Sequence, residues 1–155
     1  MSQLITEHFT IEELTRSAAA LRLCLDNTLP AQYLRNAERV ALALEKIRAH
    51  FGKPVRVTSC YRSKIVNAAV GGSLTSAHCM AMAADFEVIG VSNLDVCRAV
   101  PGIIPDYDQV IYEFGPGGWV HLGLVHRDPR GQQLTAIKVG GKTVYKPGIL
   151  DLWKI

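Results

Sequence analysis

The sequence predicts an α+β fold in which helices pack on one face of a small antiparallel sheet. Apolar residues recur with helical spacing in the first third of the chain, whereas alternating or continuously apolar runs typical of strands follow it. Glycine-rich turns at 115–118 and 140–141 separate pairs of these runs, as in hairpins. The 155 residues, of which 48% are hydrophobic, contain no linker or repeat, so we expect a single domain over residues 1–155.

Two helices are expected before the first strand. The first, over 11–17, opens with a capping box, because Thr10 can accept from the amide of Glu13 while Glu13 reaches back to the cap. The second starts near Pro30 and continues to Gly52, because its apolar residues recur at steps of three and four. These residues are Leu34, Ala37, Val40, Ala41, Leu44, Ile47 and Phe51.

Strands and shorter helices alternate over the rest of the chain. Runs of β-branched, aromatic and other apolar residues between turn residues predict the strands. The expected strands are 55–59, 83–89, 109–114, 119–125, 134–139 and 142–145. The expected helices are 62–70, which Gly71 and Gly72 end, and 93–100, which Ser92 caps.

The charge pattern does not suggest a nucleic-acid partner. Lys and Arg number 17 and Asp and Glu 14, a net charge of +3, and the basic residues are scattered. No apolar run approaches the ~20 residues that span a membrane, and the N-terminus has no basic stretch before an apolar core. We therefore expect a protein made in the cytoplasm without a signal peptide or a membrane span.

Three residues are potential metal ligands, His78, Asp85 and His121. A straight helix would separate the first two by ~10 Å and a straight strand by more than ~20 Å, so a shared ion requires a bend between them. Small residues such as Ala81 and Ala83 permit that bend. Two histidines and a carboxylate with an open fourth position are typical of a catalytic zinc site. The alternative is two buried structural histidines and an aspartate at the start of a strand.

Several ordered motifs surround these three residues. They are Ser59-Cys-Tyr-Arg-Ser63, Val66-Asn-Ala-Ala-Val-Gly-Gly72, Ser76-x-His78-x6-Asp85 and Trp119-x-His121. In this order they resemble the zinc D-Ala-D-Ala peptidase family, which includes D,D-carboxypeptidases, D,D-dipeptidases and phage endolysins that cut peptidoglycan. Phe9 to Ser17 and the pair Asp26-Asn27 are similar to its compact, phage-associated branch. The resemblance runs from about residue 8 to about residue 125.

The resemblance implies one zinc ion on the three candidate ligands, in a cleft between sheet and loop, and a peptidoglycan stem peptide as substrate. Arg62 would face the substrate carbonyl or the developing oxyanion, because a guanidinium stays charged and donates in a fixed fork. Its alternative is a surface salt bridge. Ser76 would donate to a substrate oxygen or cap the following turn. Tyr61, Tyr112 and Trp119 line the cleft or pack in the core.

The same family needs a general base, often a glutamate three residues before the final histidine, and here that position is Gly118. Glu113 is the nearest substitute, because a carboxylate near the site could accept a proton and pass it to the leaving amine. If Phe114 pairs with Trp119, Glu113 would oppose Val120 and point away from the final histidine. A bulge or an unusual loop at the glycine-rich turn would instead direct Glu113 to the face that carries the final histidine. Otherwise Glu113 is a solvated residue at a strand edge.

Three further positions depart from the family pattern. Cys60 and Ala81 stand where relatives commonly have glycine, and Met82 stands where a basic residue is frequent, so these side chains could narrow the cleft. His126 lies five residues beyond the final candidate ligand, which puts it on the opposite face of a strand.

The four cysteines, Cys24, Cys60, Cys79 and Cys97, show no CxxC spacing. In a reducing compartment we expect four free thiols. Cys60 and Cys79 border the expected site, where they could pair with each other or supply a fourth ligand. We expect both to be small buried hydrophobic side chains instead.

These observations together predict zinc-dependent hydrolysis of a peptide bond in the peptidoglycan stem peptide or cross-link. The alternative is a non-catalytic structural or binding module, such as a phage virion component, that keeps the fold. A zinc-free domain that binds a peptide or glycan would require the histidines to be incidental. A lysin without a signal peptide would accumulate in the cell and act at the cell wall after release, whereas a virion protein would act within a phage particle.

Overall fold

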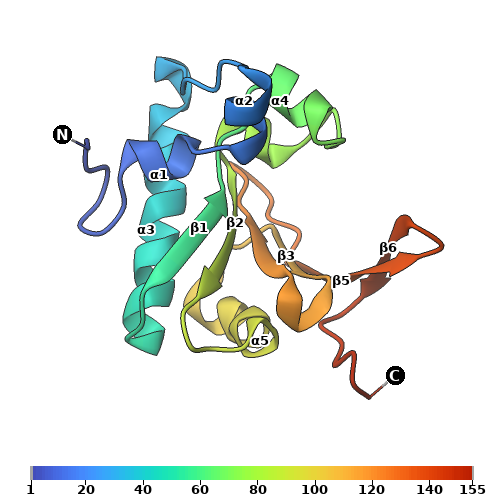
Figure 1. The fold of residues 1–155 in the computed structure, drawn as a ribbon. Helices are drawn as coiled ribbons and strands as arrows, with labels where there is room; N and C mark the ends of the chain where they lie inside the picture. Colours follow the sequence, from blue (N-terminus) through green and yellow to red (C-terminus); the bar gives the residue numbers. More distant parts are fainter. Residues whose placement is uncertain (1, 155) are drawn as a thin grey trace.

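The computed structural model describes residues 2–154 and has the expected α+β architecture, built on one six-stranded sheet (Figure 1). The strands are β1 (Val55–Ser59), β2 (Ala83–Val88), β3 (Gln109–Glu113), β4 (Trp119–Gly123), β5 (Gln132–Val139) and β6 (Lys142–Pro147). The helices are α1 (Ile11–Thr15), α2 (Ala18–Leu23), α3 (Leu34–Phe51), α4 (Lys64–Ala69) and α5 (Asn93–Ile103). Short 3-10 turns are η1 (Ala31–Tyr33), η2 (Ala77–Met80) and η3 (Gly115–Gly117).

The sheet is mixed, so the prediction of a purely antiparallel sheet is wrong at one strand pair. The strand order is β1-β2-β4-β3-β5-β6, and β3 pairs with β5 in parallel. β4 already has β2 on one side and β3 on the other, so β5 adds at the free edge of β3. The chain reverses direction between β4 and β5, and β5 therefore runs parallel to β3.

Helices α3 and α5 cover one face of the sheet, α3 over β1 and β2, and α5 over β2, β3 and β4 (Figure 1). The strand residues beneath them alternate along each strand and are buried in the same core as the apolar sides of the helices. These strand residues are Ala84, Phe86, Val88, Val110, Tyr112, Val120 and Leu122. Because side chains alternate in direction along a strand, the residues between them point to the opposite face.

The first predicted helix, over 11–17, is present as α1 and ends two residues early, and a second short helix, α2, follows it. The expected capping box is present at α1, where Thr10 accepts from the amide of Glu13 and the Glu13 carboxylate accepts from the amide of Thr10. Ser17 then starts α2 by accepting from the amide of Ala20. Serine is a strong N-cap, so it starts a second helix directly after the predicted range of 11–17, where the sequence predicts none.

The other helices occur where the sequence predicts them, with shifted ends. The long amphipathic helix starts at Leu34, after the turn η1 that Pro30 precedes. Ser63 caps α4, which is shorter than expected. Ser92 caps α5 as predicted, and this helix continues to Ile103.

Helices α2 and α4 and the turn η2 lie together at the end of the sheet where β1 stops and β2 starts (Figure 1). The β5–β6 hairpin forms the edge of the sheet opposite to β1 and extends away from the rest of the protein (Figure 1). Within residues 2–154, no helix is long and apolar enough to cross a bilayer.

Candidate metal centre

Three side chains from separate segments converge on the face of the sheet opposite α3 and α5. Asp85 lies on β2 and pairs directly in the register with His121 on β4. His78 comes from η2, just before β2. Ala81 ends η2 in the left-handed conformation, with a φ of 55°, and turns the chain into β2. The bend that a shared ion requires is therefore present.

The carboxylate of Asp85 lies between the two imidazole rings. Its Oδ1 is 2.9 Å from Nδ1 of His121, and its Oδ2 is 3.3 Å from Nε2 of His78. One ligand atom from each of the three residues lies within 4.8 Å of the others. All three side chains are buried. We call this group, His78, Asp85 and His121, the ligand cluster.

Backbone contacts hold His78 in its orientation. Its Nδ1 is 2.7 Å from the carbonyl oxygen of Cys60, and because a carbonyl only accepts, Nδ1 carries the proton of this bond. The amide of Arg62 donates to the carbonyl of His78 at 3.1 Å. In the neutral ring Nε2 is then unprotonated and faces Asp85. A metal-binding histidine is oriented in the same way when its other nitrogen donates to a backbone carbonyl.

The donor atoms of the ligand cluster fit a zinc ion. Nε2 of His78 is buried and has no hydrogen-bond partner in the part of the chain that the structure describes. A buried polar atom without a partner is costly, and a bound metal would remove that cost. Two imidazoles and one carboxylate are also the protein ligands of many catalytic zinc sites. The cluster could therefore hold a metal ion, and zinc binding stays a prediction.

Asp85 would enter a metal site as an ionised carboxylate. Burial acts to raise its pKa, but the imidazole of His78 and the hydrogen bond from His121 outweigh burial and hold the pKa well below its usual range. The carboxylate therefore needs no deprotonation before it binds a cation at neutral pH.

The loop between β3 and β4 determines where Glu113 points. Glu113, and not Phe114, pairs with Trp119, which leaves a loop of residues 114–118. Phe114 adopts the left-handed conformation, with a φ of 61°, and the turn η3 follows it. In this register Glu113, Trp119 and His121 point to one face. The unusual loop that the sequence argument required is present, and it brings Glu113 to the face of the ligand cluster.

Gly118 has no room for the glutamate that often occupies this position in the family. A Cβ atom at Gly118 would lie 1.7 Å from the carbonyl oxygen of Glu113. The Gly118 amide donates to the carbonyl of Gly115, and its carbonyl accepts from the side chain of Asn93. The close backbone approach that excludes a side chain at Gly118 belongs to the same loop that turns Glu113 toward the cluster.

The surroundings of Glu113 favour a proton on its carboxyl group. Burial is the main cause, and the negative charge of Asp85 adds to it, so that the pKa of Glu113 rises from 4.5 to about 7. The positive charges of His121 and Arg62 and the side chain of Trp119 act against this rise. A carboxyl group with a pKa near 7 can both accept and return a proton at neutral pH.

Glu113→Gln is expected to stabilise the metal-free protein, increasingly so from pH 4.5 to 7. The folded protein binds the Glu113 proton more tightly than the unfolded chain, because the pKa rises from 4.5 to about 7. The free energy of unfolding therefore falls as pH rises through this window, and glutamine, which does not ionise, removes that loss. We expect a difference of about 1–3 kcal/mol at pH 8 and almost none at pH 4. Urea denaturation of chelator-treated protein measures it, and a difference independent of pH would contradict the burial of this carboxyl.

Arg62 lies beside the ligand cluster on the segment that follows β1. Its positive charge lowers the pKa of Glu113, so the guanidinium influences the charge state of that carboxyl group. Its Nε is buried and has no hydrogen-bond partner among the described residues. None of the ion pairs within residues 2–154 includes Arg62, in contrast to the salt bridge that the sequence left as an alternative. That Arg62 donates to a substrate oxygen stays a prediction.

Asn27 holds the segment that carries Arg62. Its side-chain amide donates to the carbonyls of Thr15 and Tyr61 at 2.7 and 3.1 Å, and its oxygen accepts from the amide of Ser63 at 2.7 Å. These bonds fix the backbone on both sides of Arg62. The sequence pointed to Asn27 only as part of a family motif, because its partners are distant in the chain.

Asn27→Ala is expected to lower the free energy of unfolding by about 2–3 kcal/mol, because three hydrogen bonds are lost and their backbone partners become unsatisfied. Urea denaturation with fluorescence detection measures the loss. Thr28→Ala is the matched control, since among residues 2–154 the neighbouring Thr28 side chain bonds only to exposed Asp26, and its cost should stay under about 1 kcal/mol. Equal losses in the two variants would show that Asn27 does not hold the segment.

The other residues that the sequence suggested as substrate contacts or cleft-lining residues differ in how far they are buried. Ser76 precedes η2, and within the described chain its side chain makes no capping bond to that turn. Tyr61 is 5% exposed and packs in the core, with its ring centroid 6.4 Å from that of Tyr33. Tyr112 is also in the core, whereas Trp119 is partly exposed beside Glu113. Tyr61 thus offers little side-chain surface to a substrate, and a contact from Ser76 stays a prediction.

Three residues depart from the family pattern, and a narrowing of the cleft by their side chains stays a prediction. Cys60, Ala81 and Met82 are all buried in the core. Ala81 has a positive φ, a conformation that glycine adopts without a steric penalty. This explains why relatives commonly have glycine at the position of Ala81. Burial, and then the charge of Asp85, raise the pKa of the Cys60 thiol to about 12, so it remains protonated at neutral pH. All four cysteines are free thiols within residues 2–154, as predicted.

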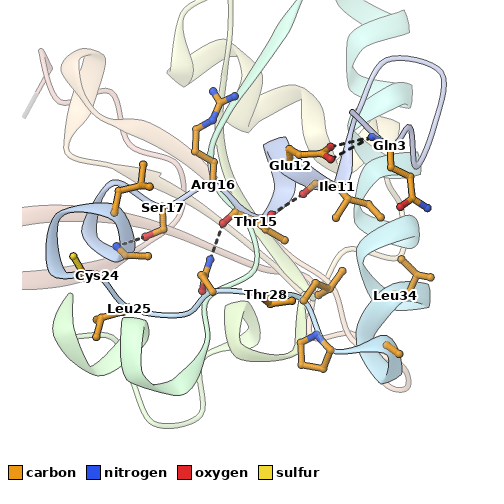
Figure 2. A pocket seen from close by; sticks show the side chains of 16 residues that line it. Gln3, Ile11, Glu12, Thr15, Arg16, Ser17, Cys24, Leu25, Thr28 and Leu34 are labelled. Atoms are coloured by element: carbon orange, nitrogen blue, oxygen red, sulfur yellow. Dashed lines mark hydrogen bonds between the residues drawn. The ribbon is translucent and has the colours of Figure 1, made fainter. Parts of the chain in front are cut away.

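Two hollows on the surface lie away from the ligand cluster. A groove of about 730 Å³ is lined by α1, α2 and the segment from Cys24 to Leu34, as Figure 2 shows, and Asn27 is part of its wall. A hollow of about 450 Å³ is lined by residues 87–94, together with Trp153 and others. Neither is lined by a residue of the cluster.

Comparison with known proteins adds one finding. A family model described as Peptidase M15 matches residues 7–122, which is well over half of the chain. A search of curated proteins found no match. The matched segment contains the ligand cluster, Arg62 and Glu113, and it ends before the β5–β6 hairpin.

Proposed function

Because the chain belongs to the peptidase M15 family of zinc D-Ala-D-Ala peptidases, we propose that it hydrolyses a peptide bond in the stem peptide or cross-link of peptidoglycan. The observation that carries the proposal is the convergence of His78, Asp85 and His121 on one face of the sheet. The unpartnered Nε2 of His78 and the presence of Glu113 on the same face support it.

In the proposed reaction the side chains bind a metal, move one proton and stabilise one developing charge. His78, Asp85 and His121 would hold zinc, which when bound acts as a Lewis acid and lowers the pKa of a water ligand to about 7. Glu113 accepts a proton from the attacking water and returns it to the leaving amine. Arg62 donates to the substrate carbonyl oxygen as negative charge develops there.

The proposed substrate is a stem peptide, cut either between L-Ala and D-Glu or at a bond that joins D-residues. Ser76 would donate to an oxygen of this peptide. The protein would act at the cell wall after release from the cell, or within a phage particle. The motif resemblance to cell-wall peptidases and endolysins supports this part of the proposal.

Zinc content and hydrolysis of purified peptidoglycan test the proposal together. We expect one zinc ion per chain in metal-replete protein and the appearance of new amino groups in digested wall. Removal of the metal by a chelator should stop hydrolysis, and added zinc should restore it.

Two results would count against the proposal in different ways. Bound zinc without hydrolysis, across walls with different stem peptides, would contradict the peptidase function and favour a non-catalytic module. Protein that binds no zinc would contradict the proposed role of the ligand cluster itself.

A further inference from the structure

The β5–β6 hairpin places Tyr145 on the face of the sheet that carries the candidate site. Across the sheet, Glu113 on β3 pairs with Ala136 on β5, and Ala136 pairs with Tyr145 on β6. Residues that pair across neighbouring strands point to the same face. Tyr145 therefore lies in the cross-strand row of Glu113, on the face that carries the ligand cluster.

The small residue between them lets the Tyr145 side chain reach toward Glu113. Ala136 is fully buried and projects only a methyl group. With strands about 4.8 Å apart, the backbones of Glu113 and Tyr145 are separated by roughly 10 Å, a gap that a tyrosine ring can largely cross. Burial, and then the negative charges of Glu113 and Asp85, raise the pKa of Tyr145. The cross-strand row therefore places Tyr145 on the face of the two acidic residues, Glu113 and Asp85, with one small residue between it and Glu113.

Contacts with the β3–β4 loop keep the hairpin beside the site. Nζ of Lys138, on β5, lies 5.1 Å from the ring centroid of Phe114. The ring of Phe114 meets the edge of Trp119 at 5.3 Å between centroids. The hairpin therefore packs on the loop that sets the direction of Glu113, although it lies outside the segment that the family model matches.

We propose that Tyr145 is a substrate-contacting residue whose phenol O–H donates a hydrogen bond to a carbonyl or carboxylate oxygen of the bound peptide. The inference rests on the proposed peptidase function. The side chain is 52% exposed, so a ligand on this face can reach the hydroxyl. A phenol beside two carboxylates keeps its proton at neutral pH and acts as a donor.

Hydrolysis kinetics of Tyr145→Phe on a soluble stem peptide test this proposal. Phenylalanine keeps the ring and removes only the hydroxyl group. We expect kcat/KM to fall about tenfold, almost entirely through KM, with kcat within about twofold of wild type. Val144→Ala is the matched control, because Val144 is the neighbouring residue on β6 and points to the opposite face. Its kcat/KM should stay within about twofold of wild type.

The outcomes separate this proposal from the proposed function. If wild type hydrolyses the peptide and Tyr145→Phe has unchanged kcat/KM, or Val144→Ala loses as much, the role of Tyr145 is refuted and the peptidase function stands. If wild type hydrolyses nothing, the proposed function fails, and calorimetric binding of the same peptide to zinc-loaded protein decides the role of Tyr145. About tenfold weaker binding by Tyr145→Phe would then support it, and equal or absent binding would overturn it.

Discussion

Replacing His121 with alanine is expected to remove bound zinc and to reduce peptidoglycan hydrolysis below detection. His121 supplies one of the three ligand atoms that lie within 4.8 Å of each other. Loss of a group that merely supports a metal ligand costs about 10–100-fold in metal affinity, so loss of a ligand should cost more. Metal analysis of the purified variant and hydrolysis of purified wall measure the two effects separately.

His126→Ala is the matched control for this variant. His126 lies beyond the end of β4 and is exposed, and it is absent from the ligand cluster. We expect one zinc ion per chain and wild-type hydrolysis from it. Full zinc content in His121→Ala, or an equal loss of zinc in both variants, would contradict the assignment of His121 as a ligand.

Replacing Glu113 with glutamine is expected to lower kcat by about 10²- to 10⁴-fold while zinc content stays at one ion per chain. Glutamine keeps the shape of the side chain but does not accept a proton from water. The variant therefore separates proton transfer from metal binding, which the ligand variants do not do. Steady-state hydrolysis of a stem peptide, with metal analysis of the same preparation, makes the measurement.

Glu87→Gln controls for the loss of a carboxylate on the same face of the sheet. Glu87 lies on β2, two residues beyond Asp85, and pairs with Arg56 instead of pointing into the cluster. We expect its kcat to remain within about twofold of wild type. Wild-type kcat in Glu113→Gln would show that another group moves the proton.

Gly118 and Glu113 together explain how this chain departs from the usual family pattern. The position of the usual glutamate is held by a glycine whose backbone touches the carbonyl of Glu113 too closely for any side chain. The loop that creates this contact also sets the register that directs Glu113 to the cluster. The glycine is therefore no reason by itself to regard the chain as inactive, which is why Glu113→Gln is an informative variant.

Features that depend on neighbouring residues along the chain could be predicted from the sequence. The capping box at Thr10, the long amphipathic helix and the strand runs follow from local hydrogen bonding and from apolar periods near 3.6 and 2 residues. The candidate ligands were found because motif order is also a property of the linear chain. Boundaries were less accurate, as at Ser17, which lies inside the predicted range 11–17 but caps a separate helix, α2.

Features that depend on contacts between distant segments could not be read from the sequence. The side to which Glu113 points changes with a shift of one residue in strand pairing, and the close backbone approach at Gly118 is part of what sets that pairing. The hydrogen bonds of Asn27 beside Arg62 link residues far apart in the chain.

The sequence by itself therefore determined the α+β class, the long helix and the identity of the candidate ligands, because these depend on local periodicity and motif order. Only the tertiary structure decided the parallel β3–β5 pair, the burial of Met82 and the alignment of Tyr145 with Glu113. The physical reason is that strand direction and register depend on which edges are free and which backbones can approach, and both are properties of the assembled sheet.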